Sequence, residues 1–475
     1  MSSPITDSRA RCAALQVLLL VLGGALAACG GPRRPASLLL ISIDTLRSDH
    51  LGAYGYPRAT SPRIDALARE GVLFRNAFAP VPRTTQSVAS ILTGLYPKHH
   101  GARGLFSYLA PGNETLAEIL KQRGYRTWAI VSNLFLQPGK GFEQGFDSYS
   151  NPRSRFDGDS AREITDEALS RLHSLPEGPF FLWVHYLEPH WTYAPRAEFA
   201  RRFEPDYVPS ERIKELDSGK FQKGEIIFRS LLSSEDRRHL VALYDAEIAQ
   251  VDAEVGRLLD GIRSEIRRDL LVVLTSDHGE SLGEHGYCFA HGEYLYDGTL
   301  RVPLLFVFPG RMRGGEDVGR TVSLLDVAPS ILRLLGLPER VGMDGIPLFA
   351  SVGGGAFAPS GGHDLLFAET DYQLIHSANP RFHMPGVRGR WAGARKGFRK
   401  LIRIPRPEGS LLEFYDLRSD PGEEQGLETR GSAEAAELAR DLDGWVDFQE
   451  GTGPDLQDLV SPEQRENLRS LGYLQ

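Results

Sequence analysis

The chain has 475 residues, with 54 Lys and Arg against 62 Asp and Glu and a formal net charge of −8. This length predicts one large domain plus a smaller one, and an acidic chain without a basic block argues against nucleic acid as a partner. Of its three cysteines, two lie within the first 29 residues, which excludes a disulfide framework, and Cys288 is interpreted as a small buried residue.

The N-terminus has the features of an export signal. Two arginines precede the apolar stretch ALQVLLLVLGGALAA, which has the length of a signal-peptide core and is short for a membrane span. The tetrad LAAC resembles a bacterial lipobox, whose cysteine is lipidated. We therefore expect a lipoprotein signal peptide at residues 1–28, with an ordinary signal peptide or a single-pass anchor as alternatives. A lipidated Cys29 would anchor the exported chain to a membrane of the cell envelope, facing the periplasm or the cell surface.

After a Gly/Pro linker at residues 29–36, apolar runs alternate with segments of helical period. The run SLLLISID shows little polar alternation, which is typical of a strand covered on both faces. Similar runs predict strands at 127–132, 180–185, 270–276 and 303–308. Segments such as ETLAEILKQRG have helical spacing between them. This alternation predicts an α/β fold with a large, mostly parallel sheet flanked by helices.

The character of the sequence changes after about residue 345. The Gly-rich stretch SVGGGAFAPSGGH precedes the short segments DLLFAET, GRWAGARKGFRKLIRI and LLEFYDL, and a helical pattern follows at 433–448. We expect an α/β catalytic domain at 37–348 and a smaller C-terminal α+β subdomain at 349–475, with antiparallel strands and a terminal helix.

Polar residues follow three of the predicted strands. Asp44 ends the first run, the segment from His185 to His190 ends another, and Asp277 with His278 ends a third. In doubly wound sheets, ligands bind beyond the carboxyl ends of the strands. Carboxylate and imidazole groups gathered at one edge are a zinc-type or manganese-type ligand set.

Several longer motifs are spread over the mature chain: SIDTLRSDHLGAYGY, SPRIDALAREGVLFRNAFAP, SILTGLYPKHHG, TLAEILKQRGYRTWAI, TSDHGE, LYDGTLRVPL, LLDVAPSILRLLGL and FYDLRSDPGEE. Together they resemble the sulfatases of the alkaline phosphatase superfamily. The resemblance implies an alkaline phosphatase-like fold. It also implies that one divalent metal is held by an early Asp, by a late Asp followed by Asn or His, and by the nucleophile. Asp44, Asp277 and His278 occupy the first three of these positions.

The nucleophile segment departs from the sulfatase signature, which is Cys or Ser, any residue, Pro, any residue, Arg, ahead of an SxLTG segment. Aligning Ser90–Gly94 with that segment places Thr84 at the nucleophile, Gln86 at the Pro and Val88 at the Arg. Thr cannot be oxidised to formylglycine, the sulfatase nucleophile. The downstream Lys and His of the family are absent, and Thr45 replaces its second early acid.

The remaining pattern is similar to phosphoethanolamine transferases, lipoteichoic acid synthases and nucleotide pyrophosphatases, which use a metal-bound Thr. The string DHGESLGE, followed by a His-Gly at His291, resembles the arrangement in phosphoethanolamine transferases. The resemblance implies that Thr84 is both metal ligand and nucleophile, since a cation makes a hydroxyl easier to deprotonate. It implies that His190 and His291 hold the ester oxygens, assist the leaving group or complete a second metal site. His278, where many sulfatases have Asn, favours zinc or manganese over calcium.

Alternatives stay open for individual residues. Thr85 and Ser87 are alternative nucleophiles, and Thr84 can also cap the helix that follows it. His185 is interpreted as packed on its strand, and Glu188 as a less favoured metal ligand.

We expect a metal-dependent hydrolase that cleaves sulfate or phosphate esters, a sulfuric ester or phosphoester hydrolase of the sulfatase family. The alternatives are a phosphoryl-group transferase, of phosphoethanolamine or phosphoglycerol type, and an inactive homologue that binds anionic glycans. The expected substrate is a sulfated or phosphorylated small molecule, glycan or lipid headgroup. A charged insert at 201–234 is expected to shape its pocket.

Overall fold

The computed structural model describes residues 35–152, 159–172, 177–204, 232–266, 269–370, 390–406 and 409–446. Contacts group Ala36–Gln475 as one compact unit. The expected signal peptide, Cys29 and most of the linker lie outside the described residues, as does the greater part of the charged insert. The predicted boundary between residues 348 and 349 stays a prediction.

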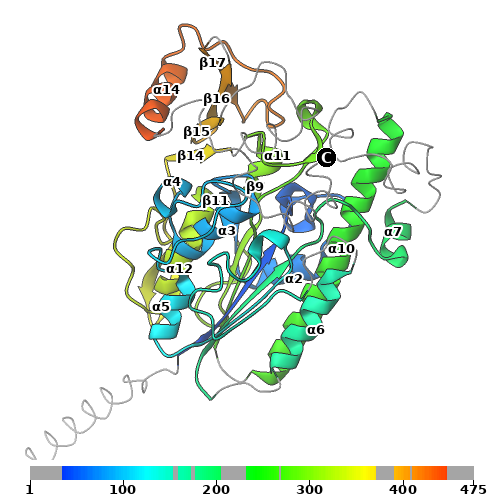
Figure 1. Cartoon of the computed structure of the whole chain (residues 1–475), viewed down its shortest axis with the longest axis vertical. Coiled ribbons are helices and arrows are strands. Elements are labelled where there is room, and N and C mark those ends of the chain that lie inside the picture. The colour runs from blue at the N-terminus through cyan, green and yellow to red at the C-terminus, as the bar shows by residue number, and fades with distance from the viewer. Residues whose placement is uncertain are drawn as a thin grey trace, which may run out of the picture. The chain divides into compact units, whose positions relative to one another are not determined.

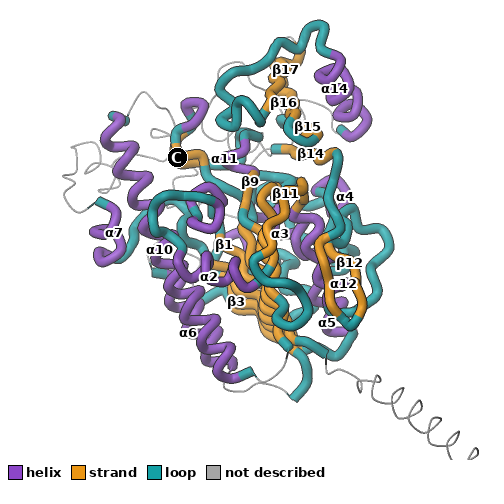
Figure 2. The backbone as a smooth tube through the Cα atoms, turned by 180° about the vertical axis from the view of Figure 1, so that it is seen from behind, coloured by secondary structure: helices purple, strands orange, loops and turns teal. Residues whose placement is uncertain are grey.

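A nine-stranded sheet forms the centre of the large domain, in the order β11-β2-β10-β6-β1-β5-β3-β4, with β9 paired to β2. Figure 2 shows it as the orange strands that include β1, β3, β9 and β11. The strands are β1 (Ser37–Ile43), β2 (Val72–Phe78), β3 (Arg126–Val131), β4 (Ser148–Ser150), β5 (Phe180–Tyr186), β6 (Leu270–Ser276), β9 (Arg301–Val302), β10 (Leu304–Val307) and β11 (Glu316–Ser323). Strand β10 is antiparallel to β2 and β6, and β9 is antiparallel to β2. The other pairs are parallel, which confirms the expected mostly parallel α/β sheet.

Helices cover both faces of this sheet (Figure 1). The helices on the two faces are α2 (Pro62–Glu70), α3 (Thr84–Thr93), α5 (Leu116–Gln122), α6 (Ser160–Leu172), α10 (Ser234–Glu265) and α12 (Val327–Leu334). The shorter helices α4 (Pro97–His100), α7 (Ala197–Phe203) and α11 (Asp297–Leu300) lie outside these two layers, and α7 packs on α10. Leu39 and Ile41 of β1 share a core with α2, α6 and α10, whereas Leu38 and Leu40 share a core with α3, α5 and α12. Successive side chains of a strand point to opposite faces, so an unbroken apolar run suits this two-sided burial.

A separate antiparallel sheet follows the large one, as expected. It contains β14 (Leu365–Glu369), β15 (Ala392–Lys396), β16 (Arg399–Arg406) and β17 (Gly409–Asp416) in sequence order. Helix α14 (Ala433–Trp445) packs Leu438 and Leu442 against Leu401 and Phe414 of this sheet. The hairpin of β12 (Phe349–Gly353) and β13 (Ala356–Pro359) instead packs Phe349 into the core of the large sheet.

The register of the central strands positions the functional edge. Ile43 at the end of β1 pairs with Ser276 of β6 on one side and with Tyr186 of β5 on the other. All three strands are parallel and end at the same level. Asp44 and Asp277, the next residues after β1 and β6, therefore leave the sheet side by side.

Candidate active site

Four of the predicted site residues meet in a buried cluster at this edge. The Oγ1 atom of Thr84 lies 3.3 Å from Nε2 of His278. The same Nε2 atom lies 3.7 Å from Oδ1 of Asp44 and 3.5 Å from Oδ2 of Asp277. Thr84 is 3% exposed and the other three side chains are fully buried. The structure thus brings together all four residues predicted as metal ligands.

The three distances from Nε2 of His278 fit a small cation. Four ligand atoms about 2.1 Å from a tetrahedral ion lie about 3.4 Å from one another, close to the observed distances from Nε2 of His278. In addition, Oδ1 of Asp44 and Oδ2 of Asp277 are buried without a hydrogen-bond partner. Buried carboxylate oxygens are costly unless a positive charge or a donor faces them.

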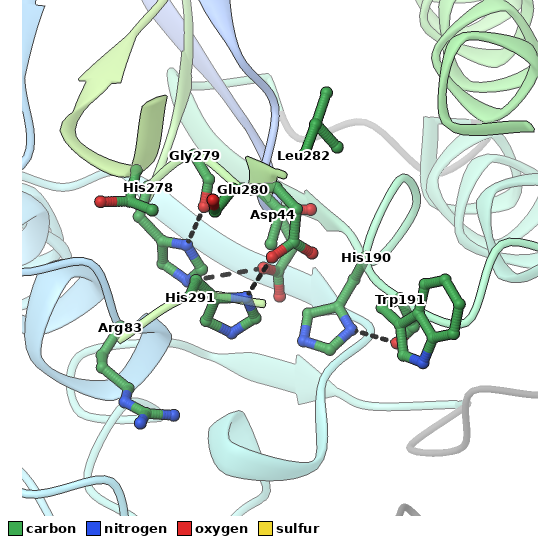
Figure 3. A network of polar contacts seen from close by, with 12 residues as sticks. Asp44, Arg83, His190, Trp191, His278, Gly279, Glu280, Leu282 and His291 are labelled. Carbon is green, nitrogen blue, oxygen red and sulfur yellow. Dashed lines mark hydrogen bonds and ion pairs between the residues drawn. The ribbon is translucent and has the colours of Figure 1, made fainter. Parts of the chain in front are cut away.

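The tautomer of His278 also suits a metal ligand. Its Nδ1 atom lies 2.9 Å from the carbonyl oxygen of Gly279 (Figure 3). A carbonyl oxygen only accepts, so Nδ1 carries the proton and the lone pair of Nε2 faces Thr84 and the two carboxylates. Holding the distal nitrogen by a backbone carbonyl is the usual way in which proteins orient a metal-binding imidazole.

The two carboxyl groups of the cluster titrate differently. Burial alone would raise the pKa of Asp44, but the contact with His185 and the positive charge that His190, His278 and His185 carry when protonated outweigh it and lower the pKa to about 2. Burial, together with the negative charge of Asp44, raises the pKa of Asp277 to about 6. Two carboxylates that share a buried site repel each other, and a cation between them would relieve this repulsion.

His185 takes part in the cluster as well as packing on its strand. Its Nδ1 atom lies 2.8 Å from Oγ of Ser42, its register partner on β1. Its Nε2 atom lies 3.6 Å from Oδ2 of Asp44. Asp44, His185 and Asp277 each offer a ligand atom within 4.8 Å of the others, and the described ranges contain no second group of this kind with three or more members.

The predicted catalytic imidazoles form a row with His278 (Figure 3). The ring of His291 lies 4.4 Å from that of His278 and 5.0 Å from that of His190. Nδ1 of His190 lies 2.5 Å from the carbonyl oxygen of Trp191, and Nδ1 of His291 lies 3.0 Å from Oε1 of Glu280. In both rings Nδ1 therefore donates to an acceptor, and Nε2 lies on the opposite side of the ring from that acceptor.

A short hairpin brings Glu280 and His291 together. Strands β7 (Ser281–Leu282) and β8 (Cys288–Ala290) are antiparallel, and Ser281 pairs with Ala290. The residues on either side of this hairpin are Glu280 and His291, so their side chains meet despite eleven positions of separation. Cys288 is buried within the hairpin, as expected.

Thr84 is the first residue of α3. It therefore does not cap a helix that begins further along the chain. Arg83 is the N-cap residue, and no side chain caps this end. The hydroxyl of Thr85 donates to the carbonyl of Leu105 at 2.8 Å, and that of Ser87 donates to the carbonyl of Asp277 at 2.6 Å. Both alternative nucleophiles are thus engaged elsewhere. The N-terminus of α3 places a partial positive charge next to the Thr84 hydroxyl.

Arg83 forms a buried ion pair that sequence reasoning missed. Its Nη2 atom lies 2.6 Å from Oε1 of Glu293, and the two residues are 2% and 4% exposed. The guanidinium lies against Gly292, where an added Cβ would be only 2.1 Å from Nε of Arg83. The pair joins the residue before Thr84 to the loop that carries His291. The sequence offered one signal for this pair, which is position. Arg83 directly precedes Thr84, and Glu293 lies two residues after His291.

Glu188 does not reach the cluster. Its carboxylate accepts from the backbone N–H and the hydroxyl of Ser160 at 2.6 and 2.7 Å, at the start of α6. Glu188 therefore caps a helix, and the structure does not support its interpretation as a less favoured metal ligand.

Comparison with known proteins decides the family. The family model described as Sulfatase matches residues 37–337. The chain belongs to the sulfatase family. The ulvan-active sulfatase of Formosa agariphila is 28% identical to this sulfatase-family chain over 343 residues, which cover 66% of this chain and 64% of that protein. The chain thus matches less than two thirds of that relative's length.

Solved structures show the same fold. One, of a protein in complex with its substrate D-glucosamine-2-N,6-O-disulfate, superposes with a TM-score of 0.68 at 22% identity, covering 92% of this chain and 99% of that one. Another, the phosphonate monoester hydrolase of Agrobacterium radiobacter, superposes with a TM-score of 0.66 at 23% identity, covering 87% of this chain and 95% of that one.

Proposed function

We propose that this sulfatase-family chain hydrolyses sulfate or phosphate esters with Thr84 as its nucleophile. Asp44, Thr84, Asp277 and His278 would hold one divalent cation. The observation that carries the proposal is the position of the Thr84 hydroxyl, 3.3 Å from Nε2 of His278. It lies in a buried cluster in which one oxygen of each carboxylate has no hydrogen-bond partner.

The chain's residues suit a two-step displacement. A bound divalent cation would supply the positive charge that lowers the pKa of a neighbouring hydroxyl. Oγ1 of Thr84 attacks sulfur or phosphorus and gives its proton to an imidazole of the row, the bond to the leaving oxygen breaks and the alcohol departs with a proton, and water then hydrolyses the Thr84 ester. His190 and His291 stand in the same row with Nδ1 engaged, so their Nε2 atoms can exchange a proton with the departing alcohol or the incoming water.

Zinc or manganese suits this ligand set better than calcium. Two carboxylates, a hydroxyl and an imidazole give four ligands with one nitrogen, whereas calcium takes six to eight oxygen ligands. A second metal at His190 and His291 has less support, because these two imidazoles offer only two ligand atoms and the described residues hold no further group of three beside them.

The names of the similar proteins support the proposed substrate class. One relative is described as active on ulvan, one similar structure holds a disulfated glucosamine, and one is a phosphonate monoester hydrolase. A sulfated glycan or a phosphorus ester is therefore the proposed substrate. The replacement of the formylglycine precursor by Thr84 favours the phosphorus ester.

A phosphoryl-group transferase is the second candidate, because the DHGESLGE string and Thr84 resemble that branch. In the part of the chain that the structure describes, no helix has the length and apolarity needed to cross a membrane. We also propose export and anchoring through a lipidated Cys29, supported only by the lipobox resemblance of the N-terminus.

The test compares the wild type, Thr84→Ala and Thr85→Ala, each loaded with zinc or manganese, on aryl sulfate, aryl phosphate monoester and aryl phosphodiester. We expect Thr84→Ala to lose turnover on every substrate. Thr85→Ala is the matched control, because its hydroxyl bonds Leu105 outside the cluster. Turnover that survives in Thr84→Ala would refute the role of Thr84 as nucleophile. A covalent substrate adduct that intact-mass analysis finds on the wild type, but not on Thr84→Ala, would support this role.

A further inference from the structure

Asn133 makes a contact with the cluster that its amide geometry determines. It lies two residues beyond β3 and is 1% exposed. Its Nδ2 atom donates to Oδ2 of Asp44 at 2.6 Å, and its Oδ1 atom accepts the backbone N–H of Phe135 at 2.7 Å. Because a backbone N–H only donates, the amide has one consistent orientation, with Nδ2 toward the carboxylate.

The two oxygens of Asp44 consequently have different surroundings. Oδ2 accepts from Asn133 and lies 3.6 Å from Nε2 of His185. Oδ1 has no hydrogen-bond partner and lies 3.7 Å from Nε2 of His278. The protein thus occupies one oxygen and leaves the other to face the cluster.

A relay from neighbouring strands supports the occupied oxygen. Nε1 of Trp183 donates to Oγ of Ser42 at 2.9 Å, and that Oγ lies 2.8 Å from Nδ1 of His185. An indole N–H only donates, so Oγ of Ser42 accepts from it and keeps both its hydrogen and a second lone pair for Nδ1 of His185. When the Ser42 hydroxyl donates to Nδ1, the proton of His185 lies on Nε2 and faces Oδ2 of Asp44.

We propose that Asn133, supported by His185, is a positioning residue that makes Asp44 a one-oxygen ligand and so selects a zinc-type cation over calcium. Zinc sites take four ligand atoms, whereas calcium sites take six to eight oxygens and often both oxygens of one carboxylate. The bond from Asn133 uses one lone pair of Oδ2 and leaves Oδ1 as the unengaged oxygen, which favours coordination of Asp44 through Oδ1 alone. This inference rests on the proposed function, since it requires the cation at Asp44.

The test measures metal binding without turnover. Purified wild type and Asn133→Ala are titrated against a zinc chelator of known affinity and, separately, with calcium by calorimetry. We expect the zinc Kd of Asn133→Ala to weaken about 10- to 100-fold, the usual effect of losing a partner of a metal ligand. The calcium Kd should change less than about threefold or tighten, so that the selectivity for zinc falls.

Two variants separate positioning from folding. Asn133→Ser keeps an acceptor for the N–H of Phe135 but is too short to reach Asp44, so it should fold normally and show the same zinc loss. Asn113→Ala is the matched control, because the Asn113 amide donates to the carbonyl of His100, away from the cluster. Its zinc and calcium affinities should equal those of the wild type.

The outcomes distinguish this inference from the function on which it rests. A wild type that binds no zinc would refute the proposed metal site itself. A wild type that binds zinc, with an unchanged zinc-to-calcium ratio in Asn133→Ala and Asn133→Ser, would refute the positioning role alone. His185→Phe should weaken zinc no more than Asn133→Ala does. A loss as large as that of His278→Ala would make His185 a ligand and overturn the supporting relay.

Discussion

Replacing Glu293 by Gln would leave the guanidinium of Arg83 buried without its charged partner. Solvent hardly reaches this ion pair, because the two side chains are 2% and 5% exposed. Nη2 of Arg83 lies 2.6 Å from Oε1 of Glu293. Removing one member of such a pair costs about 3–5 kcal/mol, because the remaining charge stays desolvated. We therefore expect the free energy of unfolding of Glu293→Gln to fall by about that amount in urea titrations.

The double variant Arg83→Met with Glu293→Gln provides the decisive comparison. Removing both charges is close to neutral when the replacement fills the space, so it should recover most of the loss of Glu293→Gln. Asp317→Asn is the control, since its ion pair with Arg75 is exposed and should contribute about 1 kcal/mol or less. A loss below about 1 kcal/mol in Glu293→Gln, or no recovery in the double variant, would refute this reasoning.

Three further predictions concern neighbouring features. Glu280→Gln keeps an acceptor for Nδ1 of His291, whereas Glu280→Ala does not. We expect kcat of Glu280→Ala to fall more than about tenfold and kcat of Glu280→Gln to fall less. Steady-state assays on the preferred ester compare the two variants. Gly292→Ala should lower the melting temperature, because this residue has a φ of 102° and its new Cβ would meet Arg83. Burial raises the pKa of Asp252 to about 7, above the unfolded value of about 3.9. The stability that this carboxyl contributes is thus full below about pH 4 and is lost as the pH rises through about 7. Calorimetry should therefore find that Asp252→Asn gains in melting temperature relative to the wild type between pH 5 and pH 8.

The strands that are buried on both faces could be predicted, because such burial leaves an unbroken apolar run in the sequence. The apolar runs at 37–44, 180–185 and 270–276 became β1, β5 and β6, the strands that position the cluster. The run at 303–308 became β10, which is antiparallel to both neighbours. Its direction could not be predicted, because a strand buried on both faces is apolar whichever way it runs. Edge strand β11 contains exposed polar residues and therefore has no comparable run.

The predictable part of the site consists of side chains that follow a strand end. Asp44, Asp277 and His278 are of this kind, and the parallel register brings them together. The missed residues act through partners distant in the sequence. Asn133 meets Asp44 across 89 positions, and Arg83 meets its carboxylate partner across 210. An Asn in a turn or an Arg before a helix is common, so only the folded arrangement gives these two a role.

The charges of the cluster bear on which ester it accepts. Asp44 and Asp277 together would neutralise a bound divalent cation, and Arg83 is neutralised by Glu293. Glu280 beside His291 adds one further negative charge, so a substrate with one negative charge meets a site without net positive charge until imidazoles take up protons. Sulfate esters, phosphodiesters and phosphonate monoesters carry one such charge, whereas a phosphate monoester carries between about 1.5 and 2 at pH 7. The cationic Arg and Lys that the sulfatase resemblance leads one to expect are missing from the aligned positions, so no side chain at these positions balances the second charge of a monoester. This balance favours the singly charged esters, a class that includes the named activities of both the sulfatase relative and the phosphonate monoester hydrolase.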